Sequence, residues 1–170
     1  MNDKLSCVPE IHMKAEGGKR MYSSLTVGQV LRAKGYGFHA ISPDATAYSA
    51  LELMADKNIG ALVVMESNKL VGVFSERDYA RKVILKGKAS KNTTVREIMT
   101  GSPIIIKPAM TLRDCMVLMS KNHIRHLPVM DNDVLLGVLS SRDVVNTIIS
   151  DQEWMIEKLE NYISGTEYAA

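Results

Sequence analysis

One segment of 40 residues occurs twice in this chain. Residues 39–78 align with residues 104–143 without a gap, at an offset of 65, and 15 of the 40 aligned pairs are identical. A single unit of ~60 residues would bury its core poorly, because so small a unit buries only ~60% of the surface that its unfolded chain exposes. The repeat therefore predicts two copies of one unit that pack on each other with pseudo-twofold symmetry.

Each copy reads as strand, helix, strand, strand, helix. After Thr46 and after Thr111, apolar and small residues recur at the i, i+3, i+4 and i+7 positions of a half-buried helix. Two short apolar runs joined by a polar turn follow, which is typical of a hairpin, and a second helix begins at Ser75 or Ser140. We therefore expect an α/β fold of two β-α-β-β-α copies, each with a three-stranded sheet that carries helices on one face.

The repeat also sets the expected domain boundaries. Short lead-in helices are predicted at residues 26–31 and 94–99, so that residues 23–90 and 91–150 form two domains, each with its own lead-in helix. Residues 1–22 are charged and lack the apolar stretch of a secretory signal, and we expect a mobile arm there.

A long C-terminal helix is predicted over residues 143–164, where apolar residues recur at roughly helical spacing, with Gly165 as its C-cap. Its last part, with the tail that follows, forms an expected extension of residues 151–170. Its apolar stripe covers a second subunit or folds back on its own core, and both arrangements fit the pattern.

The composition limits the partners of this chain. Its formal net charge is only +2 and its basic residues are interspersed with acidic ones, which does not favour nucleic acid. Apolar runs such as residues 61–65 are far shorter than the ~20 residues of a membrane span, so no membrane partner is expected.

The sequence Gly-x-x-Ser-x-Arg-Asp ends the hairpin of both copies, at residues 72–78 and 137–143. A glycine in a strand lets another group approach the backbone, and the N-terminus of the next helix favours an anion. The serine can donate to a phosphate, the arginine supplies a planar charge, and the aspartate can accept from both hydroxyls of a ribose. These groups together match a nucleotide.

The same residues have a simpler interpretation. Ser75 with Asp78, and Ser140 with Asp143, have the spacing of a capping box, which needs no ligand. The arginine that recurs between them in both copies has no use in capping, and this favours the nucleotide.

The duplicated motif, the segments 59–64 and 124–129 before the hairpins, and the Thr-Val lead-ins together resemble a tandem of cystathionine β-synthase (CBS) domains, the Bateman module. The resemblance covers residues 24–149, and residues 74–83 and 160–165 are most similar to small stand-alone CBS-pair proteins of bacteria and plant organelles. It implies a regulatory module without catalysis, which binds AMP, ADP, ATP, NAD or sometimes S-adenosylmethionine between the copies.

The resemblance also implies the residues that bind the nucleotide. Aspartates would hold the ribose, while the motif serines and arginines would meet phosphate, together with an Arg-His pair that reaches the nucleotide of the other copy. Isoleucines would lie against adenine. In that order the residues are Asp78 and Asp143; Ser75, Arg77, Ser140, Arg142, Arg125 and His126; and Ile59 and Ile124. Because Gly60-Ala61 replaces the Arg-His pair in the first copy, we expect two unequal sites.

The alternative is an interaction protein, a homodimer or regulatory subunit whose motifs only cap helices. The regulated partner is not identified by the sequence, although the plant relatives that the chain resembles suggest a redox-linked target. A cytoplasmic location is expected, with the mitochondrial matrix or another organelle interior as the alternative. We expect no metal site, because His123 and His126 have no nearby cysteine, and no nucleophile at Cys115, which lies on an apolar stripe.

Overall fold

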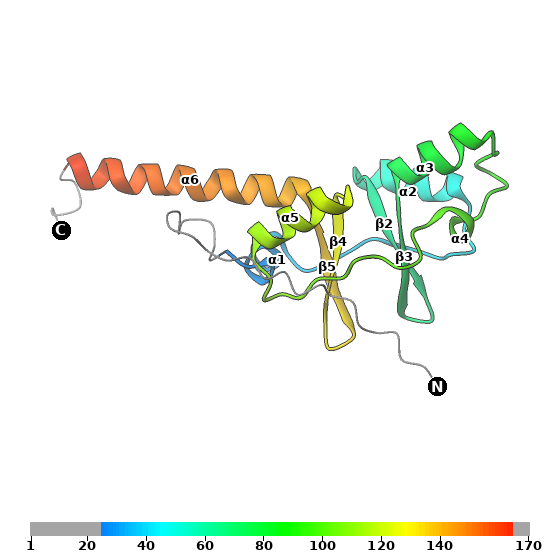
Figure 1. Cartoon of the computed structure of the whole chain (residues 1–170), viewed down its shortest axis with the longest axis horizontal. Helices are drawn as coiled ribbons and strands as arrows, with labels where there is room; N and C mark the ends of the chain where they lie inside the picture. The colour runs from blue at the N-terminus through cyan, green and yellow to red at the C-terminus, as the bar shows by residue number, and fades with distance from the viewer. Residues whose placement is uncertain (1–24, 165–170) are drawn as a thin grey trace.

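The computed structural model describes residues 25–164, which form the α/β fold of two similar halves that the repeat predicts (Figure 1). The predicted arm and Gly165 lie outside these residues. The first half contains β1 (Ala40–Ile41), α2 (Ala47–Lys57), β2 (Ala61–Glu66), β3 (Lys69–Ser75), α3 (Glu76–Lys82) and the 3₁₀ turn η1 (Ile84–Lys86). The second contains α5 (Leu112–Asn122), β4 (His126–Asp131), β5 (Val134–Ser140) and α6 (Ser141–Ser164), and the lead-in helices are α1 (Val27–Lys34) and α4 (Val95–Ile98).

Each half is built around an antiparallel hairpin, β2–β3 in the first and β4–β5 in the second. Both ladders shift register at the same place in the repeat, after Val64 in one hairpin and after Val129 in the other. The two hairpins lie next to each other with their turns pointing the same way (Figure 1). The sequence repeat is thus a repeat of backbone geometry as well.

The first strand differs between the halves. In the first half β1 pairs in parallel with β2, and the N–H of Val63 donates to the carbonyl of His39 at 3.1 Å. In the second half Pro128 stands where Val63 stands in the first, and a proline has no N–H to donate. The pairing there is a single bridge from Ile106 to Val129, so the second half has two strands and a bridge in place of the expected three strands.

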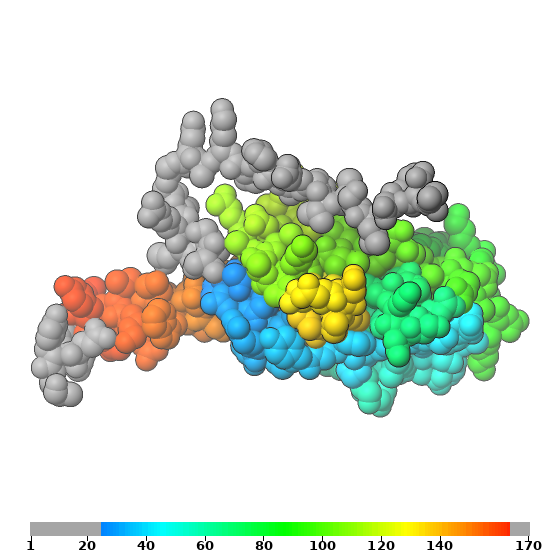
Figure 2. Space-filling model, turned by 90° about the horizontal axis from the view of Figure 1, so that it is seen from below, coloured from blue at the N-terminus to red at the C-terminus, as the bar shows by residue number. Residues whose placement is uncertain are grey.

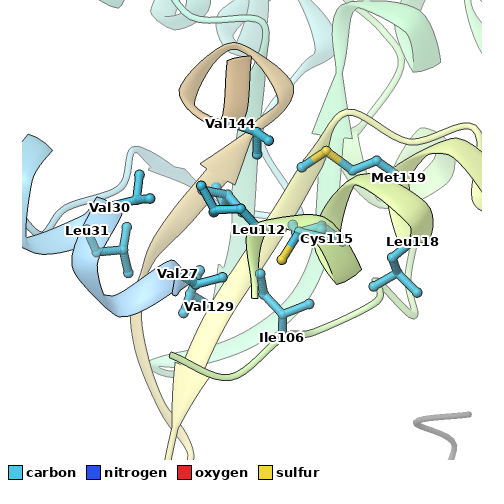
Figure 3. Close-up of a cluster of buried hydrophobic side chains, with 12 residues drawn as sticks. Val27, Val30, Leu31, Ile106, Leu112, Cys115, Leu118, Met119, Val129 and Val144 are labelled. Carbon is cyan, nitrogen blue, oxygen red and sulfur yellow. The ribbon is translucent and has the colours of Figure 1, made fainter. Parts of the chain in front are cut away.

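The two halves exchange their lead-in helices. Val27 and Leu31 of α1, which precedes the first copy, pack in the core that the second copy builds around Cys115 (Figure 3). Val95 and Ile98 of α4 pack in the core of the first copy. The expectation that each copy keeps its own lead-in helix is therefore wrong, because an apolar stripe shows that a helix has a buried face and not which core receives it.

Matched backbone hydrogen bonds fix this exchange. The N–H of Val27 donates to the carbonyl of Met110 at 2.9 Å, and at the equivalent place the N–H of Val95 donates to Ala45 at 2.8 Å. Thr26 also forms a bridge with Thr111. The pseudo-twofold axis thus relates two crossed connections as well as two cores.

The helix α6 has 24 residues, against seven in its counterpart α3, as the sequence predicts. Val144, near its start, is buried in the second core, whereas its C-terminal half extends beyond the body (Figures 1 and 2). Ile156 and Leu159 are 55% and 54% exposed there, so among the described residues the apolar side of this C-terminal half does not fold back on its own core. No helix within residues 25–164 combines the length and apolar character needed to cross a membrane.

Candidate functional site

A cleft of about 810 Å³ lies between the two halves. Its walls come from the segment after α1, from the end of α2 and the start of β2, and from the strand ends and helix start of the second copy. The residues that carry its polar and charged chemistry are Lys34, His39, Asn58, Glu76, Arg125, His126, Ser140, Ser141, Arg142 and Asp143. The cleft therefore contains the repeated motif of the second copy.

The structure brings together six of the ten predicted site residues. Those that line the cleft are Ile59, Arg125, His126, Ser140, Arg142 and Asp143. Those that do not are Ser75, Arg77, Asp78 and Ile124. Ile124 packs against the second core instead.

Asp143 is tied to its helix start through one of its two oxygens. Its Oδ2 accepts from the N–H and the hydroxyl of Ser140, at 2.7 and 2.8 Å, and from the ammonium of Lys34 at 2.8 Å. Among the described residues Oδ1 takes part in no hydrogen bond. The capping box is therefore present, and it leaves one carboxylate oxygen with the capacity to accept.

Asp78 has no such spare oxygen. Its Oδ2 accepts from the N–H and hydroxyl of Ser75, at 3.1 and 2.6 Å, and its Oδ1 pairs with Lys82 at 2.8 Å. Four residues beyond the repeat, at the same offset of 65, Thr147 stands in place of Lys82, and its hydroxyl donates to the backbone carbonyl of Asp143. The two copies of the motif therefore differ in the hydrogen-bonding capacity that remains: Asp143 has one oxygen left to accept a hydrogen bond, and Asp78 has none.

The two arginines differ in the same sense. Arg77 donates to the backbone carbonyl of His123, the left-handed residue that ends α5. Arg142 makes no hydrogen bond or ion pair to any described residue, and it lines the cleft together with Asn58, the equivalent of His123. In the first copy, the motif arginine and aspartate thus already have hydrogen-bond or ion-pair partners within the chain.

The fixed charges of the cleft favour an anion. Lys34, Arg125 and Arg142 outnumber Glu76 and Asp143, which leaves a net charge of +1 when the histidines are neutral. Burial of Asp143 would raise its pKa, but the hydrogen bonds from Lys34 and Ser140 outweigh burial and hold the pKa below its ordinary value. Asp143 is therefore ionised at neutral pH.

His126 is a half-buried titratable group of this cleft. Burial lowers its pKa, against the opposing effect of the Asp143 charge, so the ring is neutral at pH 7. The Cβ that an alanine would carry at Gly60 would lie 3.9 Å from Cε1 of His126. The first copy thus has a small residue beside the imidazole of the second.

The Arg-His pair, Arg125 and His126, is expected to reach the nucleotide of the other copy. In the structure these two residues line the cleft that holds Asp143, the aspartate of their own copy.

The comparisons with known proteins agree with this architecture. The family model for the CBS domain matches residues 35–84 and 95–150. This chain belongs to the CBS-domain family. Pairs of CBS domains are generally regulatory modules that bind nucleotides containing adenosine, and the resemblance seen in the sequence is confirmed.

Two curated relatives are stand-alone CBS proteins. The mitochondrial CBS domain-containing protein CBSX3 of Arabidopsis thaliana is 35% identical over 85% of this chain and 74% of its own length. The CBS domain-containing protein YhcV of Bacillus subtilis is 32% identical over 66% of this chain and 79% of its own. A solved CBS-domain protein of Burkholderia ambifaria, 42% identical, covers 75% of this chain and 96% of its own, with a TM-score of 0.73.

The motif glycines of this CBS pair let another segment of the same chain pack closely against each strand. A Cβ at Gly72 would lie 2.7 Å from Sδ of Met99 and 2.9 Å from the carbonyl of Thr100. A Cβ at Gly137 would lie 3.2 Å from the carbonyl of Gly37. The group that approaches each strand is therefore the segment after the exchanged lead-in helix. A bound phosphate is not needed to explain why glycine occupies these two positions.

Sequence reasoning missed two charged residues of the cleft. Lys34 lies outside the repeated 40 residues, and in the lead-in alignment its counterpart is Ser102. Glu76 is exposed and occupies the variable position of the motif, where the second copy has Ser141. The exchange of α1 carries Lys34 to the second copy, so no pattern within one copy could have placed it beside Asp143.

Within residues 25–164, no three side chains of the types His, Cys, Asp and Glu are grouped to hold a metal ion. Cys115 is buried, and burial raises the pKa of its thiol to about 12. This cysteine is therefore a poor nucleophile in the folded chain.

Proposed function

We propose that this CBS pair is a non-catalytic sensor that binds one adenine nucleotide, AMP, ADP, ATP or NAD, in the cleft beside Asp143. The observation that carries the proposal is the difference between the two aspartates. Asp143 keeps one oxygen without a partner among the described residues, whereas both oxygens of Asp78 are taken. A ribose needs an acceptor that the fold has not already used.

The ribose hydroxyls would donate to Oδ1 of Asp143, while the capping box keeps this carboxylate at a fixed angle. The phosphates would lie among Arg142, Arg125 and Lys34, where a permanent positive charge and guanidinium donors favour an anion. The volume of about 810 Å³ falls within the ~300–1,000 Å³ range of small-molecule sites.

The adenine would lie against the apolar residue Ile59, with Met54 close by. The segment of residues 35–39 forms the facing wall, with backbone groups that can read the edge of the base. This segment joins α1 to β1, so a bound nucleotide would contact both halves. We infer that the ligand biases the arrangement of the halves, as a regulatory module requires.

The motif of the first copy would bind more weakly. Both oxygens of Asp78 and the guanidinium of Arg77 would have to give up partners before they could hold a ligand. Ser75, Arg77, Asp78 and Ile124 therefore form a second, lower-affinity site in this proposal.

The proposal is tested with a matched pair of variants, Asp143→Asn and Asp78→Asn. Both remove the same charge from equivalent capping boxes, so their structural costs are comparable. A ligand at 100 times its dissociation constant should stabilise the wild-type chain by ~2.7 kcal/mol. Thermal shift and calorimetry with the four nucleotides should show that Asp143→Asn loses most of this gain and Asp78→Asn keeps it.

Two results would contradict the proposal. Undiminished binding by Asp143→Asn would remove this aspartate from the site. The absence of heat and thermal shift for every nucleotide at millimolar concentration would leave the sensor without a ligand.

We further propose that the chain forms a homodimer and regulates a protein partner, since CBS pairs often form dimers and a solved CBS-CP12 relative is hexameric. We place it in the cytoplasm, with the mitochondrial matrix or another organelle interior as the alternative, since the plant relative CBSX3 is mitochondrial. Purification of the tagged chain with and without nucleotide would identify a partner whose binding depends on the ligand.

The second candidate function is an interaction protein without a ligand. The capping boxes at Ser75 and Ser140 are both formed by residues of the chain itself, which supports this alternative. It predicts that no nucleotide changes the melting temperature of the wild-type chain or of either asparagine variant.

A further inference from the structure

We propose that α6 pairs with α6 of a second copy as a short parallel coiled coil. The contact would be a strip of six residues, here called the α6 seam, which consists of Val145, Ile149, Gln152, Ile156, Leu159 and Ile163. This inference deepens the homodimer part of the proposed function. It does not depend on the nucleotide.

The spacing of the α6 seam is that of a heptad repeat. Successive members are four, three, four, three and four residues apart, which alternates the a and d positions of a coiled coil. This mean of 3.5 residues differs from the 3.6 of a straight helix, and two helices keep such a strip facing each other by supercoiling. The strip is therefore suited to a second helix.

The body of the molecule leaves the apolar residues of the α6 seam exposed. Val144 and Ile148, on the neighbouring face of the helix, pack on the second core. Val145 and Ile149 are 54% and 47% exposed beside the body, and farther along Ile163 is 83% exposed. The exposed apolar members of the seam are thus found both beside the body and at the end of the helix.

The projecting part of α6 needs a partner to remain helical. A free helix of about 14 residues is marginal in water, because most helix stability in proteins comes from packing an apolar face. In Figure 2 the C-terminal half of α6 extends past the rest of the described body. A second α6 would cover its apolar side along the full length of the seam.

The composition of the seam favours two parallel strands. Isoleucine occupies all three a positions, Ile149, Ile156 and Ile163, and Leu159 occupies a d position. β-branched residues at a, with leucine at d, favour parallel dimers. A second copy of this chain supplies the same strip in the same register.

The flanking charges select the same orientation. Glu153 and Glu160 follow the d residues, at the e positions, whereas the g positions carry Met155 and Tyr162. In an antiparallel pair e positions face each other, which brings glutamates together. In a parallel pair each e position faces a g position, so Glu160 meets an apolar or aromatic residue. Like-charge repulsion therefore disfavours the antiparallel arrangement.

The first test compares Ile156→Glu with Trp154→Glu in the full chain. The two side chains are each 55% exposed and lie on the same turn, but only Ile156 belongs to the seam. Because each dimer buries two copies of Ile156, its replacement should raise the dimer dissociation constant at least ~100-fold in analytical ultracentrifugation. Trp154→Glu should leave the constant near that of the wild type.

The second test fixes the orientation by cross-linking. In a parallel pair Leu159 faces Leu159 of the second copy, so Leu159→Cys in a Cys7→Ser background should form an intermolecular disulfide under mild oxidation. Glu157→Cys, on a different face of the same helix, should stay reduced. Cross-linking of both variants to the same extent would show random collision and overturn the proposal.

Other outcomes are equally decisive. A monomeric wild-type chain would overturn the pairing. If the chain dimerised only after removal of residues 1–22, that segment and not a second α6 would be the partner of the seam. Equal effects of Ile156→Glu and Trp154→Glu would show an unspecific apolar contact. A dimer that survives Ile156→Glu would place the dimer contact elsewhere. Nucleotide binding by Ile156→Glu should be unchanged, so failure of this inference is distinguishable from failure of the sensor.

Discussion

The difference between the two motif copies arises from single residues outside the motif. Lys82 pairs with Asp78 from the next turn of its own helix, whereas Lys34 reaches Asp143 from the exchanged helix. Lys34 and the capping Ser140 both donate to Oδ2 of Asp143, so Oδ1 of Asp143 remains able to accept a hydrogen bond. The sequence predicts two unequal sites from the Arg-His pair alone, but it gives both aspartates the same role. The lysines that distinguish the aspartates are distant in the chain or occupy positions that differ between the copies.

At the same scale, His126 should make the stability of the unliganded protein depend on pH. Burial lowers its pKa, so the unfolded chain takes up a proton near pH 6.5 before the folded chain does. The unfolded state is therefore favoured as pH falls below ~6.5, and the contribution of the neutral ring is retained above it. Urea midpoints measured between pH 7.5 and 5.5 should fall more steeply for the wild type than for His126→Gln. Identical slopes would show that this ring is not protected from protonation.

At the scale of elements, the exchange of the lead-in segments explains the glycines in the middle of the motif strands, Gly72 in β3 and Gly137 in β5. The backbone of Thr100 pairs with Val73 on the strand next to Gly72, and Gly37 forms a bridge with Gly137. Helices, hairpins and their order are predictable from period and turn residues within each copy. The partner of a lead-in helix is not, because it depends on how two units cross, which no local pattern records.

Gly72→Ala should therefore destabilise the fold by about 1–3 kcal/mol. The added methyl would press on Met99 at 2.7 Å and on the carbonyl of Thr100, which is backbone and cannot easily move. Gly101→Ala is the matched control, because its Cβ would lie 4.0 Å from the nearest atom, Cε of Met99. Denaturant unfolding of both variants measures the difference. Equal stabilities would mean that the strand and the crossing segment can separate without cost.

At the scale of the whole molecule, the repeat predicts two halves and their pseudo-twofold relation, and both are confirmed. The boundaries expected at residues 23, 91 and 151 stay predictions, and the exchange bears on them. Val95 and Ile98 complete the first core although they lie beyond residue 90, while Val27 and Leu31 belong to the second. A structural half is therefore not the same stretch of chain as a sequence copy with its lead-in.

Two fragments of nearly equal length distinguish these definitions. Residues 35–100 contain every residue of the first core, whereas residues 23–90 lack Val95 and Ile98 and leave Val27 and Leu31 without their partners. Loss of a buried valine or isoleucine contact costs ~1 kcal/mol or more, which a unit of this size cannot spare. Residues 35–100 should therefore give more dispersed amide spectra and a more cooperative thermal transition than residues 23–90. If residues 23–90 folded as well or better, α1 would be able to pack on the core of its own copy. The exchange would then arise only when the two copies pack together, and the first core would not require α4.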